Sequence, residues 1–253
     1  MRQNITSRRI SVINLKGGTG KSSLSMNLAH LLALRGYSVV LIDCDMQGNS
    51  SSLLPRWEPP TLTHFLRGEA PFPAIIRPAR DRLAIIPSDR DLNTAATYIA
   101  SRRHAYYTLR DAVQRLRCDF VIYDHAPSYS PVTEAALLAS SEILIPCELA
   151  PFSVQAVFTM FGKLEDTLQD HRLVNSGIVP YNVDYRYLMT WRYLKELEQK
   201  FGALIAPLVR SDAAISRAQS VRQTVWEYDA RSRAAKDFAK LADYLLARQE
   251  PRP

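Results

Sequence analysis

The stretch Lys16–Ser23, KGGTGKSS, decides how this chain folds. It follows the short β-rich run RRISVIN and precedes the helical pattern KSSLSMNLAHLLALRG, which ends on Gly36. Glycines between a strand and a helix let backbone N–H groups converge on phosphate oxygens, and the helix N-terminus adds the positive end of its dipole. The stretch therefore predicts a loop that binds the phosphates of a nucleoside triphosphate.

The loop contains two lysines, and they stand at opposite ends of its glycines. We expect Lys21 to reach the β- and γ-phosphates and the Ser22 hydroxyl to bind Mg²⁺. The residues expected to bind the nucleotide are Lys16, Gly17, Gly18, Thr19, Gly20, Lys21, Ser22 and Ser23. The usual phosphate loop has four residues between its first glycine and the Gly-Lys pair, whereas this loop is shorter and begins with lysine.

In this respect the chain resembles the deviant Walker A ATPases of the ParA/MinD superfamily, whose loop reads KGGxGK followed by two Ser or Thr residues. In that family the first lysine reaches across a dimer interface to the ATP bound by the partner. The resemblance implies that Lys16 acts on the neighbouring subunit's site, and that an ATP-dependent homodimer encloses ATP and Mg²⁺.

Two further segments carry the same resemblance. LIDCDMQGNSS resembles the family's DxDPQGN element, with Met46 in place of the usual proline, and FVIYDHAPS resembles a Walker B strand. The resemblance implies that Asp45 orients the attacking water, that Asp43 lies near the metal, and that Asp124 holds a water ligand of Mg²⁺. His125 is assigned no role.

The order of apolar runs and helical patterns predicts the fold class. The runs YSVVLIDCD, DRLAIIPSD, CDFVIYDHAP, SEILIPCEL and LVNSGIVPYN alternate with helical segments. This order is typical of an α/β fold with a mostly parallel, twisted β-sheet and helices on both faces. We expect one P-loop ATPase domain over residues 1–253 without an N-terminal helix-turn-helix domain, because only about ten residues precede the first strand. Residues 53–115 match the family only loosely.

The charge of the chain favours an anionic partner. The 253 residues carry a formal net charge of +7. Between residues 186 and 222 there are seven basic and three acidic residues. The family binds non-specific double-stranded DNA as an ATP-bound dimer, which implies the DNA-contacting candidates Arg186, Arg210, Arg217 and Arg222. Asn182 and Pro207 follow late strands, where this fold usually holds adenine.

Composition bears on the compartment. No segment approaches the length of a membrane span, no signal peptide is visible, and the cysteines at 44, 118 and 147 are isolated from one another. We expect a cytoplasmic, nucleoid-associated protein.

The resemblance implies a Mg²⁺-dependent ATPase, weak alone, that a ParB-like or adaptor protein stimulates to segregate a plasmid or chromosome. One alternative is an ATPase that positions a protein complex such as a carboxysome or chemotaxis cluster. A second is a MinD-like membrane-associated ATPase, although the terminal RQEPRP is too polar to insert. A metabolic or iron–sulfur relative is a third, but Cys118 and Cys147 are poorly placed to bind a cluster between subunits.

Overall fold

The computed structural model describes residues 7–167, 171 and 173–248 of the chain. The strands are β1 Arg8–Val12, β2 Val39–Cys44, β3 Arg77–Arg80, β4 Leu83–Ile86, β5 Phe120–His125, β6 Glu142–Glu148, β7 Val174–Val183 and β8 Val209–Arg210. The α-helices are α1 Lys21–Leu34, α2 Leu62–Leu66, α3 Leu92–Ala100, α4 Ala105–Val113, α5 Pro131–Leu138, α6 Ser153–Thr167, α7 Leu188–Phe201, α8 Ala213–Ser220, α9 Val225–Tyr228 and α10 Arg233–Ala247. The terminal residues 249–253, on which part of the expectation about the polar tail rests, lie outside the described ranges.

The strands form one eight-stranded sheet in the order β3-β4-β2-β5-β1-β6-β7-β8. β3 is antiparallel to β4, and the other paired strands run parallel to one another. The mostly parallel sheet that the sequence predicted is confirmed. Because parallel strands end at one edge, the loops that follow β1, β2, β5 and β6 meet there.

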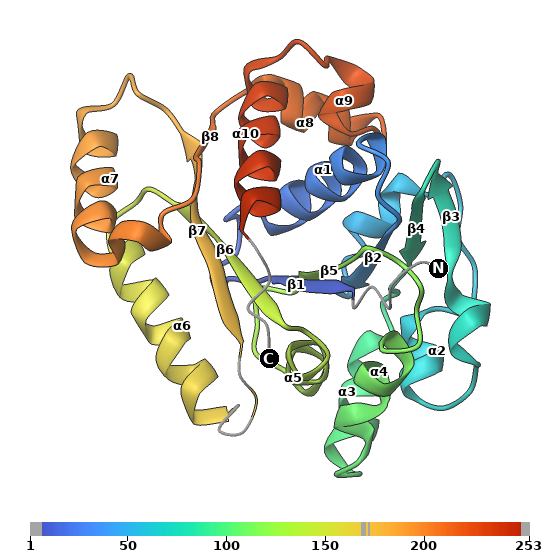
Figure 1. Cartoon of the computed structure of the whole chain (residues 1–253). Helices are drawn as coiled ribbons and strands as arrows, with labels where there is room; N and C mark the ends of the chain where they lie inside the picture. The colour runs from blue at the N-terminus through green and yellow to red at the C-terminus, as the bar shows by residue number, and fades with distance from the viewer. Residues whose placement is uncertain (1–6, 168–170, 172, 249–253) are drawn as a thin grey trace.

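Helices cover both faces of the sheet (Figure 1). α1, α8, α9 and α10 lie on one face, and their apolar side chains form a cluster with inward residues of β1, β2 and β5. α2, α3, α4 and α5 lie on the other face and form a second cluster. The predicted two-sided α/β architecture is therefore confirmed.

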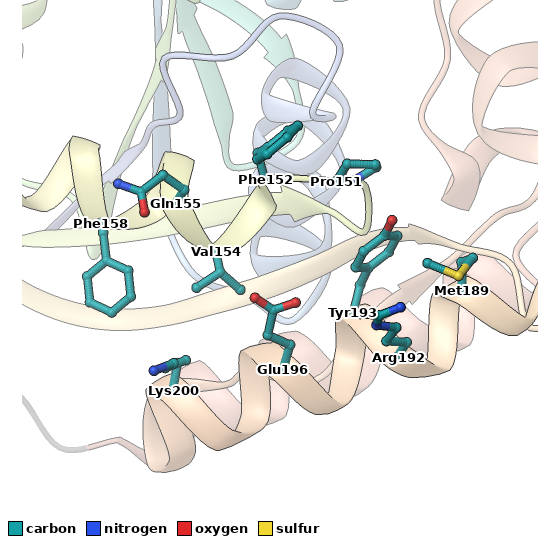
Figure 2. Close-up of a pocket in the computed structure, with 10 residues that line it drawn as sticks. All are labelled: Pro151, Phe152, Val154, Gln155, Phe158, Met189, Arg192, Tyr193, Glu196 and Lys200. Carbon is teal, nitrogen blue, oxygen red and sulfur yellow. The ribbon is translucent and has the colours of Figure 1, made fainter.

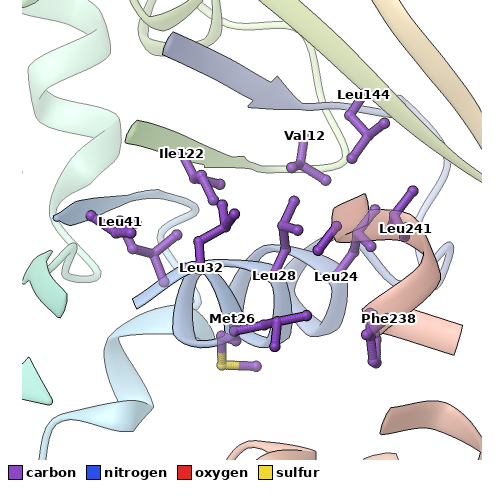
Figure 3. Close-up of a cluster of buried hydrophobic side chains, with 14 of the residues drawn as sticks. Val12, Leu24, Met26, Leu28, Leu32, Leu41, Ile122, Leu144, Phe238 and Leu241 are labelled. Carbon is purple, nitrogen blue, oxygen red and sulfur yellow. The ribbon is translucent and has the colours of Figure 1, made fainter. Parts of the chain in front are cut away.

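Helix α1 positions the phosphate loop because it is buried along most of its length. Figure 3 shows Leu24, Leu28 and Leu32 of α1 among Val12, Leu41, Ile122 and Leu144 of the sheet and Phe238 and Leu241 of α10. Each fully buried leucine contributes about 1.5–3 kcal/mol relative to an exposed one. The helix ends before Gly36, whose φ of 91° is the left-handed conformation favoured by glycine.

Across residues 7–167, 171 and 173–248, the structure contains no helix that is both long and apolar enough to cross a bilayer.

Candidate nucleotide-binding site

The phosphate loop connects β1 to α1 at the carboxyl edge of the sheet. Gly20 precedes the helix with φ 86°, and the ring of Tyr181 from β7 packs directly on it. A Cβ at position 20 would lie 2.2 Å from a ring carbon of Tyr181. Only glycine fits there, because a side chain would meet both the ring and an unfavourable backbone conformation.

Lys21 lies inside this loop. Its side chain is buried, and Nζ donates a hydrogen bond of 2.9 Å to the backbone oxygen of Lys16. Burial lowers the pKa of Lys21, while the carboxylates of Asp124 and Asp45 oppose this shift. The structure thus holds a cation where the glycine loop turns, as the sequence predicted for a phosphate ligand.

Lys16 begins the loop, and its side chain faces the surface. Its side chain is 47% exposed, and Nζ is 3.7 Å from Oε2 of Glu148 at the end of β6. It also lines a groove of about 400 Å³ beside the first turns of α6. The two lysines of the motif therefore have different surroundings, one enclosed and the other accessible.

Two buried carboxylates lie side by side behind the loop. Asp43 of β2 and Asp124 of β5 are partners in the parallel ladder, and both are fully buried. Burial raises the pKa of each, and the negative charge of Asp43 adds to the rise at Asp124. Ser50 Oγ donates to Asp124 at 2.5 Å, while Ser51 donates to Asp43 from both its backbone nitrogen and Oγ at 2.7 Å. The two carboxylates thus anchor the segment that follows β2.

Asp45 is also buried, and it begins the turn that follows β2. Its Oδ1 accepts a hydrogen bond of 3.0 Å from the backbone nitrogen of Gln47, and its backbone oxygen accepts from Gly48. Its negative charge opposes the fall in the pKa of Lys21, so the carboxylate lies within electrostatic range of the phosphate loop. This position suits the predicted contact with an attacking water.

The oxygen ligands around Ser22 suit a hard cation. The Ser22 side chain interacts with Asp124 and opposes the rise in the pKa of that carboxyl group. In the described part of the chain, no group of three or more His, Cys, Asp or Glu residues is placed to bind a metal. Mg²⁺ keeps several waters and takes few protein ligands, so one hydroxyl and one carboxylate beside the phosphates fit it. Asp43 is engaged by Ser51 and by the backbone nitrogen of Asp45, and its predicted role near the metal stays a prediction.

His125 lies on the opposite side of β5 from Asp124. Its Nε2 is 2.7 Å from Ser11 Oγ, and burial lowers its pKa to about 3. The imidazole is therefore neutral and belongs to a buried polar cluster.

The two candidates for adenine binding were expected to follow strands, but Asn182 lies within the last residues of β7 and Pro207 lies just before β8. Asn182 is exposed with φ 58°, directly after Tyr181, and Pro207 is half-buried. Their role with adenine stays a prediction, although the contact of Tyr181 with Gly20 brings the end of β7 against the phosphate loop.

The predicted DNA-contacting arginines differ in whether their side chains already pair with other groups of the protein. Arg210 pairs with the buried Asp237 at 2.7 Å, and Arg186 pairs with Asp184 at 2.5 Å. Arg222 Nη1 donates to the backbone oxygen of Pro55 at 2.8 Å. Arg217 on α8 is exposed.

Three features of the site were not predicted from the sequence. The first is the packing of the Tyr181 ring on Gly20, and the second is the pair of hydrogen bonds from Ser50 and Ser51 to the buried carboxylates. The third is a hydrogen bond of 2.6 Å from Gln219 Nε2 on α8 to Ser23 Oγ. Ser50 and Ser51 belong to the LIDCDMQGNSS segment, and their position soon after two aspartates could have predicted a contact with a carboxylate. No local pattern pointed to Tyr181 or Gln219.

A separate groove of about 540 Å³ lies between α6 and α7 (Figure 2). Phe152, Phe158, Met189 and Tyr193 line it together with charged side chains of α7, and Phe152 is 85% exposed. None of the residues that line this groove belongs to the phosphate loop.

Comparison with known proteins gives independent evidence about the family of this chain. A family model described as an AAA domain matches residues 7–176. The chromosome-partitioning ATPase Soj of Thermus thermophilus is 30% identical over 244 residues, which cover 95% of this chain and 96% of Soj.

Two solved structures share the fold. An ATP complex of McdA from Cyanothece has a TM-score of 0.85 at 21% identity, covering 98% of this chain and 99% of McdA. Cobyrinic acid a,c-diamide synthase from Mycobacterium smegmatis, with bound ADP and magnesium, has a TM-score of 0.81 at 23% identity, covering 95% of this chain and 94% of the synthase. At these identities, both show the fold alone.

Proposed function

The chain belongs to the ParA/MinD superfamily of deviant Walker A ATPases, and from this premise we propose that it is a partition ATPase that joins two subunits around Mg²⁺-ATP. In this proposal, ATP binding forms the homodimer, the dimer binds DNA without sequence preference, and hydrolysis returns the subunits to the free state. A ParB-like or adaptor protein stimulates hydrolysis, and the cargo is a plasmid or chromosome.

The contrast between the two lysines of the loop carries this proposal. Lys21 is enclosed by its own loop, and so it serves the nucleotide of its own subunit. Lys16 is accessible, and its one ion pair is half-exposed and 3.7 Å long. Such surface pairs contribute about 0–1 kcal/mol, so Lys16 can leave Glu148 to meet a nucleotide held by another subunit.

The remaining residues of the site suit hydrolysis by positioning. Loop amides and Lys21 bind the phosphates, Ser22 and Asp124 suit Mg²⁺, and Asp45 is placed to orient water. The bound metal would neutralise charge on the phosphates. Hydrolysis then breaks the bond between the β- and γ-phosphates and yields ADP and phosphate.

Separate substitutions of the two lysines test the proposal. We expect Lys21→Ala to weaken ATP binding by about 100-fold or more, because it removes the cation inside the loop. We expect Lys16→Ala to bind ATP within about threefold of wild type, yet to stay monomeric and hydrolyse no ATP. ATP binding is measured by calorimetry and subunit association by light scattering, each with ATP, ADP and no nucleotide.

The exposed Lys240 on α10 provides the matched control. Lys240→Ala should resemble wild type in both measurements. Dimerisation of Lys16→Ala with ATP would refute the proposed action across the interface.

DNA binding is part of the same proposal, with Arg186, Arg210, Arg217 and Arg222 as the contacting candidates. They lie on the β7–α7 connection, in β8, and in or just after α8, near the elements that pack on the phosphate loop. Binding of random-sequence duplex through these arginines should require ATP and weaken steeply with salt. The same DNA binding supports the proposed cytoplasmic, nucleoid-associated location.

A further inference from the structure

A cluster of arginines surrounds α4, within the middle segment that the sequence resemblance covers only loosely. We call it the α4 basic strip, and it consists of Arg102, Arg103, Arg110, Arg115 and Arg117. From residue 92 to residue 117, Asp111 is the one acidic residue in the sequence. The strip thus has a local excess of four positive charges, which is more than half of the formal charge of +7 on the whole chain.

The arginines of the strip are exposed and mostly unpaired. Arg102, Arg103, Arg115 and Arg117 are all exposed. Within the described ranges, none of these four makes an ion pair with a carboxylate. Arg110 pairs only with its exposed neighbour Asp111. By contrast, Arg186 and Arg210 of the predicted DNA surface are each paired with a carboxylate.

Tyrosine rings hold two guanidinium groups of the strip in place. The Arg102 guanidinium lies 4.2 Å from the centre of the Tyr98 ring, and that of Arg110 lies 4.5 Å from the centre of the Tyr107 ring. Stacking leaves the N–H donors of Arg102 accessible, whereas Nε and Nη2 of Arg110 contact Asp111. Both guanidinium groups are thus oriented before a ligand arrives.

The strip lies far from the surface that was predicted to bind DNA. α4 packs with α3 and α5 on one face of the sheet, whereas α8, which carries Arg217, lies on the opposite face (Figure 1). The neighbouring acidic residues are Asp91 before α3, Glu134 in α5, Glu69 after α2 and Asp119 just after Arg117. Glu69 is paired with Arg67, and Asp119 accepts hydrogen bonds from Ser38. The strip is therefore a second basic surface and does not extend the first.

Length and composition identify the partner. α4 is about 14 Å long, at about 1.5 Å for each of its nine residues, and the other four arginines lie just beyond its two ends. Duplex DNA presents one phosphate charge per about 1.7 Å of axis, so several phosphates face a strip of this length. Protein interfaces and membrane-binding helices need apolar anchors, and among the residues of α4 only Tyr107 is a large apolar side chain that is exposed.

We propose that the α4 basic strip binds the phosphate backbone of double-stranded DNA, and that this binding does not require ATP. α4 packs with α2, α3 and α5 on the face of the sheet opposite α8, and the strip arginines are already exposed, so no nucleotide-dependent change is needed to expose them. A subunit that has lost its ATP would then stay near DNA through the strip. This proposal does not depend on the ATP-dependent surface.

The test measures binding of random-sequence duplex DNA by the full chain without nucleotide and with ATP, across a salt series. One variant changes Arg102, Arg103, Arg115 and Arg117 to Gln. Without nucleotide, we expect weak, salt-sensitive binding by wild type, and a salt slope lower by about 2 to 4 in the variant, since each phosphate contact contributes about 0.9. With ATP, the variant should keep the nucleotide-dependent gain in affinity and its ATP turnover.

The matched control removes four exposed charges elsewhere, by changing Arg82, Arg90, Lys195 and Lys240 to Gln. Its salt slope without nucleotide should equal that of wild type. Measuring the pairs Arg102/Arg103 and Arg115/Arg117 separately, each with an expected fall of about half, guards against a folding defect in the fourfold variant.

Three results would overturn the proposal. They are an absence of ATP-independent DNA binding in wild type, an unchanged slope in the strip variant, and an equal loss in the control. If the strip variant instead loses binding to anionic lipid vesicles while keeping its DNA slope, the partner is a membrane and the proposal also fails. If wild type binds DNA equally well with and without ATP, the proposed function is refuted, while the proposal about the strip is retained.

Discussion

At the scale of single residues, the phosphate loop depends on the contact between Gly20 and Tyr181. The ring occupies the space that a Cβ at position 20 would need, and the φ of Gly20 is unfavourable for other residues. We expect Gly20→Ala to weaken ATP binding by at least about 100-fold and to lower the free energy of unfolding by about 1–3 kcal/mol. Calorimetric ATP titration and denaturant unfolding measure the two effects.

Gly18→Ala is the control for this prediction. Gly18 also has a positive φ, of 74°, but no atom lies within 4 Å of a Cβ built there. Its loss of stability should therefore be smaller, and reducing the ring with Tyr181→Leu should restore part of the stability of Gly20→Ala. Equal losses for the two glycines would mean that backbone strain, and not the ring, explains the effect.

The sequence predicted the loop residues well, because glycines and a Lys-Ser pair at a strand–helix junction have few other uses. Tyr181 could not be found this way, because it lies 161 positions from Gly20 and the contact exists only once β7 joins the sheet. The same holds for Gln219 and Ser23. Arg210 was predicted from its place in the family pattern, but its partner Asp237 lies on α10 while Arg210 lies on β8, and no local signal predicts the pair.

At the scale of elements, the pair of Arg210 and Asp237 joins β8 to α10. Arg210 makes two hydrogen bonds of 2.7 Å to the carboxylate, and its backbone nitrogen adds a third of 3.1 Å. Asp237 is 4% exposed, so Arg210→Ala would leave a buried carboxylate without its cation. We expect this change to lower the free energy of unfolding by about 2 kcal/mol, less than for a fully buried pair because the guanidinium is one-third exposed.

The exposed Arg217 provides the comparison, since its removal should change stability by no more than about 0.5 kcal/mol. Denaturant unfolding of both variants, followed by DNA titration with ATP, separates a structural arginine from a binding one. If Arg210→Ala folds as stably as wild type and loses DNA, then Arg210 is a direct DNA contact.

Elements with strong apolar patterns were predicted, and short or weakly patterned ones were not. The six predicted apolar runs correspond to β1, β2, β4, β5, β6 and β7. β3 has the sequence RPAR and β8 has two residues, so neither carries a run long enough to recognise. α5 was also not predicted, although Ser130 and Pro131 mark its start. Its alanines make the helical spacing of the larger apolar residues hard to recognise.

At the scale of the whole molecule, two of the three hydrophobic clusters of the described residues share the same central strands, and the third lies around α6 and α7. Val39 and Leu41 of β2 belong to the cluster beneath α1, while Val40 and Ile42 belong to the cluster beneath α3 and α4. Successive side chains of a strand point to opposite faces, so loss of β2 would open both clusters at once. Loss of one of these two clusters therefore destabilises the other, because both depend on β2.

This coupling predicts that residues 1–253 unfold as one domain. We expect a single transition in calorimetry, with a ratio of calorimetric to van't Hoff enthalpy near one. ATP and Mg²⁺ at about 100 times the dissociation constant should add about 2.7 kcal/mol, which raises the midpoint by roughly 5–10 °C without splitting the transition. Two transitions, of which only one moves with ATP, would show that the helices near α4 form a separate folding unit, and the one-domain prediction would then be wrong.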